Sequence, residues 1–203
     1  MPDALRNLKV YFSKACLGLA ATLTLSGCVL APQTIQLAET SEVKPASAAV
    51  NRGALVRVAD RREDLDDRRY LGNRGGRLAE NSPLHAQDEL ATVLSLRLQD
   101  SMAQLGFGGA SPVEPVKVEL GINKFDYSCN EGVLVTACSV SMRFEMTVLD
   151  GKRTFTKPYG LTESRRVAAA PVKEYNEQWV NDVLDRLWEY IFSDPELRGY
   201  LGV

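Results

Sequence analysis

The chain has 203 residues, with 24 Lys and Arg against 26 Asp and Glu, one histidine and four cysteines. This length accommodates one conventional hydrophobic core. A slightly acidic total without a lysine cluster argues against nucleic-acid binding, because phosphate contacts need a concentrated basic surface.

The N-terminus has the layout of a bacterial lipoprotein signal. Three basic residues precede a short apolar run over 15–25, which ends in the lipobox Leu25-Ser26-Gly27-Cys28. Cleavage would remove residues 1–27, and Cys28 would then carry a diacylglycerol on its thiol and an acyl chain on its amine. Two or three chains in one bilayer make a lasting anchor. An uncleaved spanning helix and a plain secretory signal are the weaker alternatives, because spanning needs about 20 predominantly apolar residues.

The residue after the cysteine is Val29. Lipoproteins that Gram-negative bacteria retain at the inner membrane usually carry an Asp there. By resemblance to that sorting rule, the chain is expected at the periplasmic face of the outer membrane. Residues 28–53 contain prolines and small residues without a sustained hydrophobic period, so they are expected to form a lipidated tether, to which 34–37 could add a short strand. Residues 54–203 are then expected to form a single periplasmic domain.

This domain is expected to begin with an alternating strand over 54–59, followed by a stretch over 60–77 that is dense in both charges. Such a mixed run is usually a solvated loop, in which neighbouring acids satisfy the arginines. Alternatively, the guanidinium groups present bidentate donors to a phosphate or carboxylate ligand. The candidate contacts in this stretch are Arg61, Arg62, Arg68, Arg69 and Arg74.

A helix is expected to begin at Ser82, with Pro83 in its first helical position. An apolar stripe then continues to Leu105 at helical spacing, and Gly106 would end the helix.

Three strands follow. The first alternates over 116–122 and then changes parity, which predicts a β-bulge near Asn123-Lys124. The second alternates over 138–148 with Arg143 on its polar side, and this arginine is a further candidate contact. Asp150-Gly151 predicts a tight hairpin into a third strand over 153–163, where Pro158 favours an edge position because it has no N–H to donate.

Two of the four cysteines remain free to pair. Cys16 would leave with the signal peptide and Cys28 would be acylated, so Cys129 and Cys138 remain together in an oxidising compartment. A disulfide between them is expected. A zinc site is rejected, because two cysteines without a nearby histidine supply only half of a tetrahedral shell.

The last large element is an amphipathic helix over 172–192, followed by a short terminal helix after Ser193-Asp194-Pro195. Trp179 and Trp188 lie on its wide apolar stripe, which indicates core packing rather than a ligand surface. The order strand, helix, three strands, helix predicts an α+β two-layer sandwich with a mainly antiparallel sheet and two amphipathic helices on one face.

No reaction emerges from the motifs. Nucleophilic catalysis normally needs a base within reach, and His85 is the only histidine, without a GxSxG or SxxK motif. Metal hydrolysis lacks a His-Glu-x-x-His pattern. No catalytic residue, metal site or cofactor is therefore expected beyond the lipid on Cys28. Paired carboxylates keep an enzyme alternative open, because glycosidase pairs have no short signature.

Several short motifs together resemble the YajG-like family of bacterial lipoproteins. They are the lipobox, the strand end Val-Arg-Val-Ala-Asp-Arg-Arg over 56–62, Tyr-Leu-Gly-Asn-Arg over 70–74, the helix end over 102–107 and the acidic aromatic C-terminal helix. The resemblance implies a periplasmic domain anchored at the outer membrane. It transfers no catalytic residue.

The leading functional hypothesis is a non-enzymatic, membrane-tethered domain that binds or scaffolds another envelope component, either a protein or a glycan. Its expected contact surfaces are the arginine-rich stretch and the polar sheet face. A second hypothesis is an assembly factor similar in architecture to the lipoprotein that plugs the lipopolysaccharide translocon. An enzyme acting on peptidoglycan is the third, and it would need a cleft lined by two carboxylates, whereas a flat polar face favours binding.

Overall fold

The computed structural model describes residues 31–46, 50–75, 82–108, 111–131, 136–168 and 171–203. The predicted signal peptide over 1–27 and the predicted lipidation site Cys28 lie outside these residues. Within the described ranges, no helix is long and apolar enough to cross a membrane.

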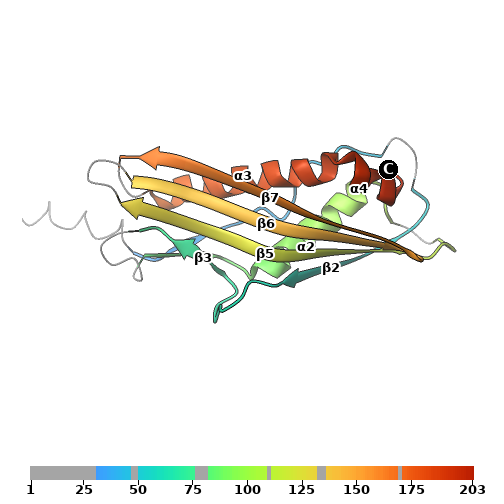
Figure 1. The fold of residues 1–203 in the computed structure, drawn as a ribbon, viewed down its shortest axis with the longest axis horizontal. Helices are drawn as coiled ribbons and strands as arrows, with labels where there is room; N and C mark the ends of the chain where they lie inside the picture. Colours follow the sequence, from blue (N-terminus) through green and yellow to red (C-terminus); the bar gives the residue numbers. More distant parts are fainter. Residues whose placement is uncertain (1–30, 47–49, 76–81, 109–110, 132–135, 169–170) are drawn as a thin grey trace, which may run out of the picture.

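The fold is an α+β arrangement of one seven-stranded sheet and three helices (Figure 1). The strands follow the order β1-β4-β3-β5-β6-β7, and β2 pairs with β5 outside this path. β5, β6 and β7 form antiparallel pairs, whereas β2 and β3 run parallel to β5. The elements are β1 Gln33–Ile35, β2 Ala54–Asp60, β3 Tyr70–Asn73, β4 Pro83–Ala86, α2 Leu90–Gln104, β5 Val116–Glu131, β6 Thr136–Asp150, β7 Arg153–Val167, α3 Lys173–Ser193 and α4 Pro195–Leu201.

The long hairpins confirm the strand predictions. Along β6 every second side chain is buried, as its alternation requires. The β5–β6 register shifts between Ile122 and Lys124, where the parity change predicted a bulge. Pro158 lies in β7, at the edge of the sheet. Trp179 and Trp188 of α3 are fully buried, so this aromatic stripe is core.

The start of α2 differs from the predicted helix. Pro83–Ala86 form β4, which pairs with β3 and β1, and α2 begins at Leu90. A proline without an N–H fits the first residue of a strand as well as the first turn of a helix. Leu84 and Ala86 are both buried and lie two residues apart, which is the strand period.

Residues 33–45, which we name the strap, pack onto the domain and differ from the tether predicted over 28–53. Ile35, Leu37 and Val43 are buried in the core. The backbone of Ala38 donates to the Asn181 side chain of α3 at 2.8 Å, and Val43 donates to Gln104 of α2 at 2.9 Å. The strap therefore contacts both long helices. Gln33, Ile35 and Leu37 are buried at the strand period, but this run is too short to indicate burial of the whole strap from the sequence.

Candidate functional site

The outward side of β5, β6 and β7, which we name the open face, carries mainly polar side chains. Figure 1 shows these three strands side by side along the domain. α3 packs on β6 and β7, and the alternate residues of β6 on that side are buried. The outward side chains of β6 are Ser139, Ser141, Arg143, Glu145 and Thr147.

Hydroxyl groups pair across the strands of the open face. Ser128 of β5 lies 3.0 Å from Ser139 of β6, and Ser141 lies 2.9 Å from Thr162 of β7, measured between their oxygens. A hydroxyl both donates and accepts, so these rows retain unused capacity toward an external ligand.

Arg143 lies in the middle of the open face. Its cross-strand neighbours are Lys124 on β5 and Gly160 on β7. Lys124 has a carboxylate nearby, since its amine lies 3.9 Å from Asp126. Arg143 is exposed, and no carboxylate of the described residues lies within ion-pair distance of it. This leaves an exposed guanidinium beside a second cation, on the side of the sheet that no described helix covers.

Arg61 lies on the same side of the sheet, but its guanidinium is already paired with two carboxylates. Its guanidinium donates to Glu145 at 2.6 Å and to Glu119 at 2.8 Å. These hydrogen bonds, led by that of Glu145, raise the pKa of Arg61. Gly121 makes room beneath it, because a Cβ there would lie 2.7 Å from the Arg61 Cζ. Arg61 therefore ties three strands together across the face.

Arg62 is buried and structural. Its Nε and Nη2 donate to the two carboxylate oxygens of Asp60 at 2.9 and 2.8 Å, and it also donates to the carbonyls of Tyr70 and Arg68. Burial raises the pKa of Asp60, but the hydrogen bonds from Arg62 outweigh burial and hold this pKa below 3.8.

The other arginines of the charged stretch also differ in whether they are exposed or buried. Arg68 donates to the Arg62 carbonyl at 2.6 Å, and the exposed Arg69 forms a two-bond pair with Asp67. Arg74 is 1% exposed and lies near Tyr127, and burial lowers its pKa. The burial of Arg62 and Arg74 does not fit the surface contacts predicted for them, because chain folding encloses both.

The expected disulfide is present. Cys129 of β5 and Cys138 of β6 are directly opposite in the register, and their sulfurs are bonded at 2.02 Å. Both side chains point to the buried side, and the Tyr127 hydroxyl lies 3.3 Å from the Cys129 sulfur. The bond closes the β5–β6 hairpin near its tip.

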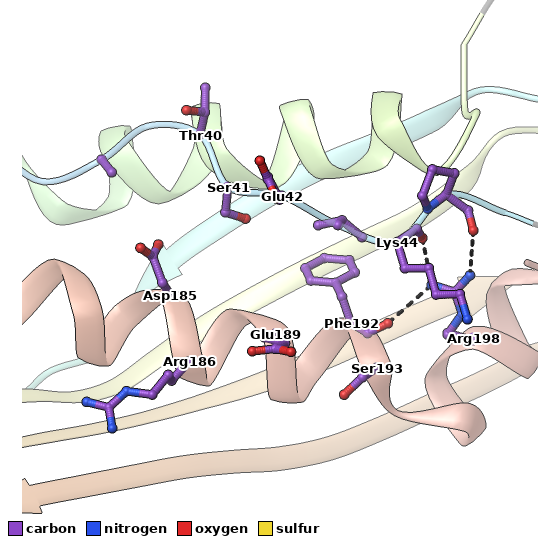
Figure 2. A pocket seen from close by; sticks show the side chains of 13 residues that line it. Thr40, Ser41, Glu42, Lys44, Asp185, Arg186, Glu189, Phe192, Ser193 and Arg198 are labelled. Atoms are coloured by element: carbon purple, nitrogen blue, oxygen red, sulfur yellow. Dashed lines mark hydrogen bonds between the residues drawn. The ribbon is translucent and has the colours of Figure 1, made fainter.

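A groove of about 960 Å³, which was not predicted, lies between the strap, α3 and α4 (Figure 2). Phe192 lies in it, and the carboxylates of Glu42 and Glu189 project at its sides. Asp185 also lines the groove but is paired with the buried Arg97. Neither histidine nor cysteine is among the residues that line it. The groove exists because the strap packs beside α3 and α4, which are far from it in the sequence.

The fold defines a class: a small α+β domain built on one mixed sheet, in whose described residues no cluster of His, Cys, Asp and Glu could hold a metal ion. The chain belongs to a family whose model, described as "uncharacterized lipoprotein", matches residues 41–202. Membership in a lipoprotein family implies a lipid anchor in a membrane. It confirms the lipoprotein class predicted from the sequence, whereas the finer YajG-like resemblance stays a prediction.

Two solved structures are similar to the chain over most of its length, with low sequence identity and TM-scores below 0.5. Protein XCC0632 from Xanthomonas campestris, of the family DUF330, is 13% identical with a TM-score of 0.47, covering 79% of this chain and 95% of its own. An uncharacterized protein is 17% identical with a TM-score of 0.45, covering 78% of this chain and 99% of its own. No curated protein matches the chain.

Proposed function

We propose that this protein is a non-enzymatic binding or scaffolding domain, held at the periplasmic face of the outer membrane by lipid on Cys28, that contacts another envelope component through its open face. The observation that carries the proposal is the exposed Arg143 beside Lys124 on a face that no described helix covers. Antiparallel sheets commonly leave one face to solvent, and on this face no carboxylate of the described residues lies within ion-pair distance of Arg143, so its guanidinium is available to a partner.

The chemistry of the open face suits a partner with anionic and hydroxyl groups. Arg143 offers a planar set of donors that matches a carboxylate or phosphate. The surrounding hydroxyl rows, such as Ser141 with Thr162, can donate to or accept from a protein backbone or a glycan. The groove described above is lined by the strap, α3 and α4 and not by the open face, and a small substrate would need a concave site, so the open face suits a broad partner better.

The peptidoglycan-enzyme alternative would have to use the groove beside the strap. Its carboxylates do not form an evident acid and base pair, because Asp185 is engaged by Arg97 while Glu42 and Glu189 are exposed. A general acid of a glycosidase needs a raised pKa, which comes from an apolar environment. The groove therefore supports the enzyme hypothesis only weakly. The open face gives stronger support to the binding hypothesis.

In-cell photocrosslinking tests the proposal. A photoreactive residue replaces Ser139 or Thr162 on the open face, so that Arg143 stays in place, and Gln178, which is exposed on α3, is the control position. Capture of one dominant envelope protein from both open-face positions and not from Gln178 supports a scaffolding role. Recovery of lipopolysaccharide would favour the translocon-type assembly role, and recovery of peptidoglycan a glycan ligand. Equal capture from Gln178 would contradict the open face as the contact surface.

A further inference from the structure

The strap fixes where the lipid is attached relative to the domain. β1 begins at Gln33, five residues after Cys28. Five residues reach at most about 18 Å when fully extended. The Gln33 side chain is buried, accepts a hydrogen bond from Asn176 at 2.8 Å and donates to the Pro171 carbonyl at 3.4 Å. The anchor is therefore tied closely to the start of α3.

Several elements meet at this end of the molecule, which we name the anchored end. It comprises the start of β1, the disulfide-bonded part of the β5–β6 hairpin, the end of β7 and the start of α3. β6 leads away from it for 15 residues, or about 50 Å, to the turn at Asp150–Arg153. That distal turn lies much farther from the anchor than the five-residue linker can reach.

The exposed chemistry of the anchored end suits a lipid surface. Val172 is 55% exposed, and the exposed cations Lys173 and Arg166 lie near it in the chain. Neither Val172 nor Lys173 stabilises the N-terminus of α3, the helix that they begin. Valine is a poor N-cap and makes no side-chain cap here, and a cation is disfavoured at a helix N-terminus. An apolar side chain with neighbouring cations fits the boundary between phosphate headgroups and acyl chains.

We propose that the domain stands upright, with its anchored end resting on the phospholipid headgroups of the leaflet that holds the Cys28 lipid. Val172 enters the headgroup layer, and Lys173 and Arg166 lie at the level of the phosphates. In this orientation the strands of the open face run along the membrane normal. The face then stands perpendicular to the membrane, and a partner beside the domain can reach it. The inference rests on lipidation of Cys28 and does not depend on which partner binds.

The competing orientation lays the open face flat on the bilayer. That face carries Asp126, Glu119 and Glu145 together with its cations, and the carboxylates would meet an anionic surface. It also lacks aromatic side chains in its rows on β6. The anchored end also carries an exposed carboxylate, Glu174 in the first turn of α3, so the upright orientation is favoured by the short linker from Cys28 to Gln33 together with the exposed Val172.

Position-dependent quenching separates the two orientations. The full lipidated chain is reconstituted in vesicles of phosphatidylethanolamine and phosphatidylglycerol that contain a lipid with a nitroxide on its headgroup. A fluorescent amino acid is introduced by codon suppression at Val172 or at Val113, a matched valine that is 52% exposed and precedes β5 near the distal turn. A third position, Thr162, reports on the open face.

Quenching several-fold stronger at Val172 than at both Val113 and Thr162 is the expected result. Strongest quenching at Thr162, or equal quenching at all three positions, would overturn the upright orientation. The intact mass of the same sample shows whether Cys28 carries lipid, and a protein that holds to the vesicles without it overturns the inference as well. Because these vesicles contain no envelope partner, neither outcome bears on the crosslinking test of the open face.

Discussion

Arginines that look alike in the sequence have different physical roles in this domain. Arg62 is enclosed with Asp60, whereas Arg143 is exposed on the open face. Arg143 lies on the polar side of a regularly alternating strand, which indicates exposure, whereas Arg62 lies in a run of mixed charge whose pattern does not reveal its burial. The difference arises from contacts far apart in sequence, such as the hydrogen bond from Arg62 to the Tyr70 carbonyl. This is why the candidate site could be predicted only as a set of arginines.

Replacing Asp60 by Asn should lower the free energy of unfolding by about 3 kcal/mol near neutral pH, because Arg62 would stay buried without its charged partner. The folded-state pKa of Asp60 lies below 3.8, so its contribution is present above that pH and is lost as pH falls through the folded-state pKa. Urea unfolding at several pH values should therefore show a constant gap between the two proteins down to about pH 5 and a narrowing gap below about pH 4. A gap that stays unchanged in strong acid would contradict this assignment.

Gly72 makes the closest backbone approach in the sheet. A Cβ there would lie 1.9 Å from the Tyr127 carbonyl oxygen, and the residue has φ of +141°. Gly72→Ala should therefore separate β3 from β5 and destabilise the domain by more than about 3 kcal/mol. Gly151→Ala is the matched control, because Gly151 also has positive φ, +59°, but open space around its Cα. Its cost should be about 1–2 kcal/mol in thermal or urea unfolding.

At the scale of elements, long regular patterns were predictable and short ones were not. β6 keeps the strand period for 15 residues, and α3 keeps an apolar stripe for 21, so their burial follows from spacing alone. β3 and β4 have four residues each, too few to establish a period. Their places are set by tertiary pairing, of β3 with β5 and of β4 with β1. Because of this pairing, the residues from Pro83, which were expected to begin a helix, form a strand.

The disulfide stabilises the β5–β6 hairpin by limiting the unfolded chain. Replacing both Cys129 and Cys138 by Ser should lower the free energy of unfolding by about 2.5–3 kcal/mol, the chain-entropy value for a loop of about ten residues. Adding a reductant to the wild-type protein should reproduce most of this loss and should leave the double variant unchanged. Equal stability of oxidised and reduced wild-type protein would show that the bond does not contribute to folding stability.

At the scale of the whole molecule, the strap makes the membrane-proximal chain part of the folded unit. Ile35 is fully buried, although it lies in the stretch expected to be a tether. Ile35→Ala should cost about 2–4 kcal/mol, as for other large-to-small core changes. Val113→Ala, at a valine that is 52% exposed, should change stability by less than about 0.5 kcal/mol. If the two substitutions had equal effects on the free energy of unfolding in urea, the strap would be a loose linker that does not stabilise the domain.

Membrane attachment is expected to depend on one residue outside the folded unit. Cys28→Ala should leave a protein that is either released into the periplasm or unprocessed, because the residue that would accept the lipid is lost. Fractionation of envelopes with an antibody against the domain measures this. Processed Cys28→Ala protein that remains with the membrane would reveal a second mode of attachment.

The edge strand β7 has a further consequence, which concerns crowding in the plane of the membrane. Lipid anchoring confines copies to two dimensions and brings their sheet edges together, and a 15-residue free edge is a template for edge-to-edge aggregation. Pro158 interrupts that template because it has no N–H. Glu163 and Arg165 place charges on the inward side of the same strand, where a second sheet would have to bury them. The sequence of β7 therefore favours a domain that stays dispersed at high surface density.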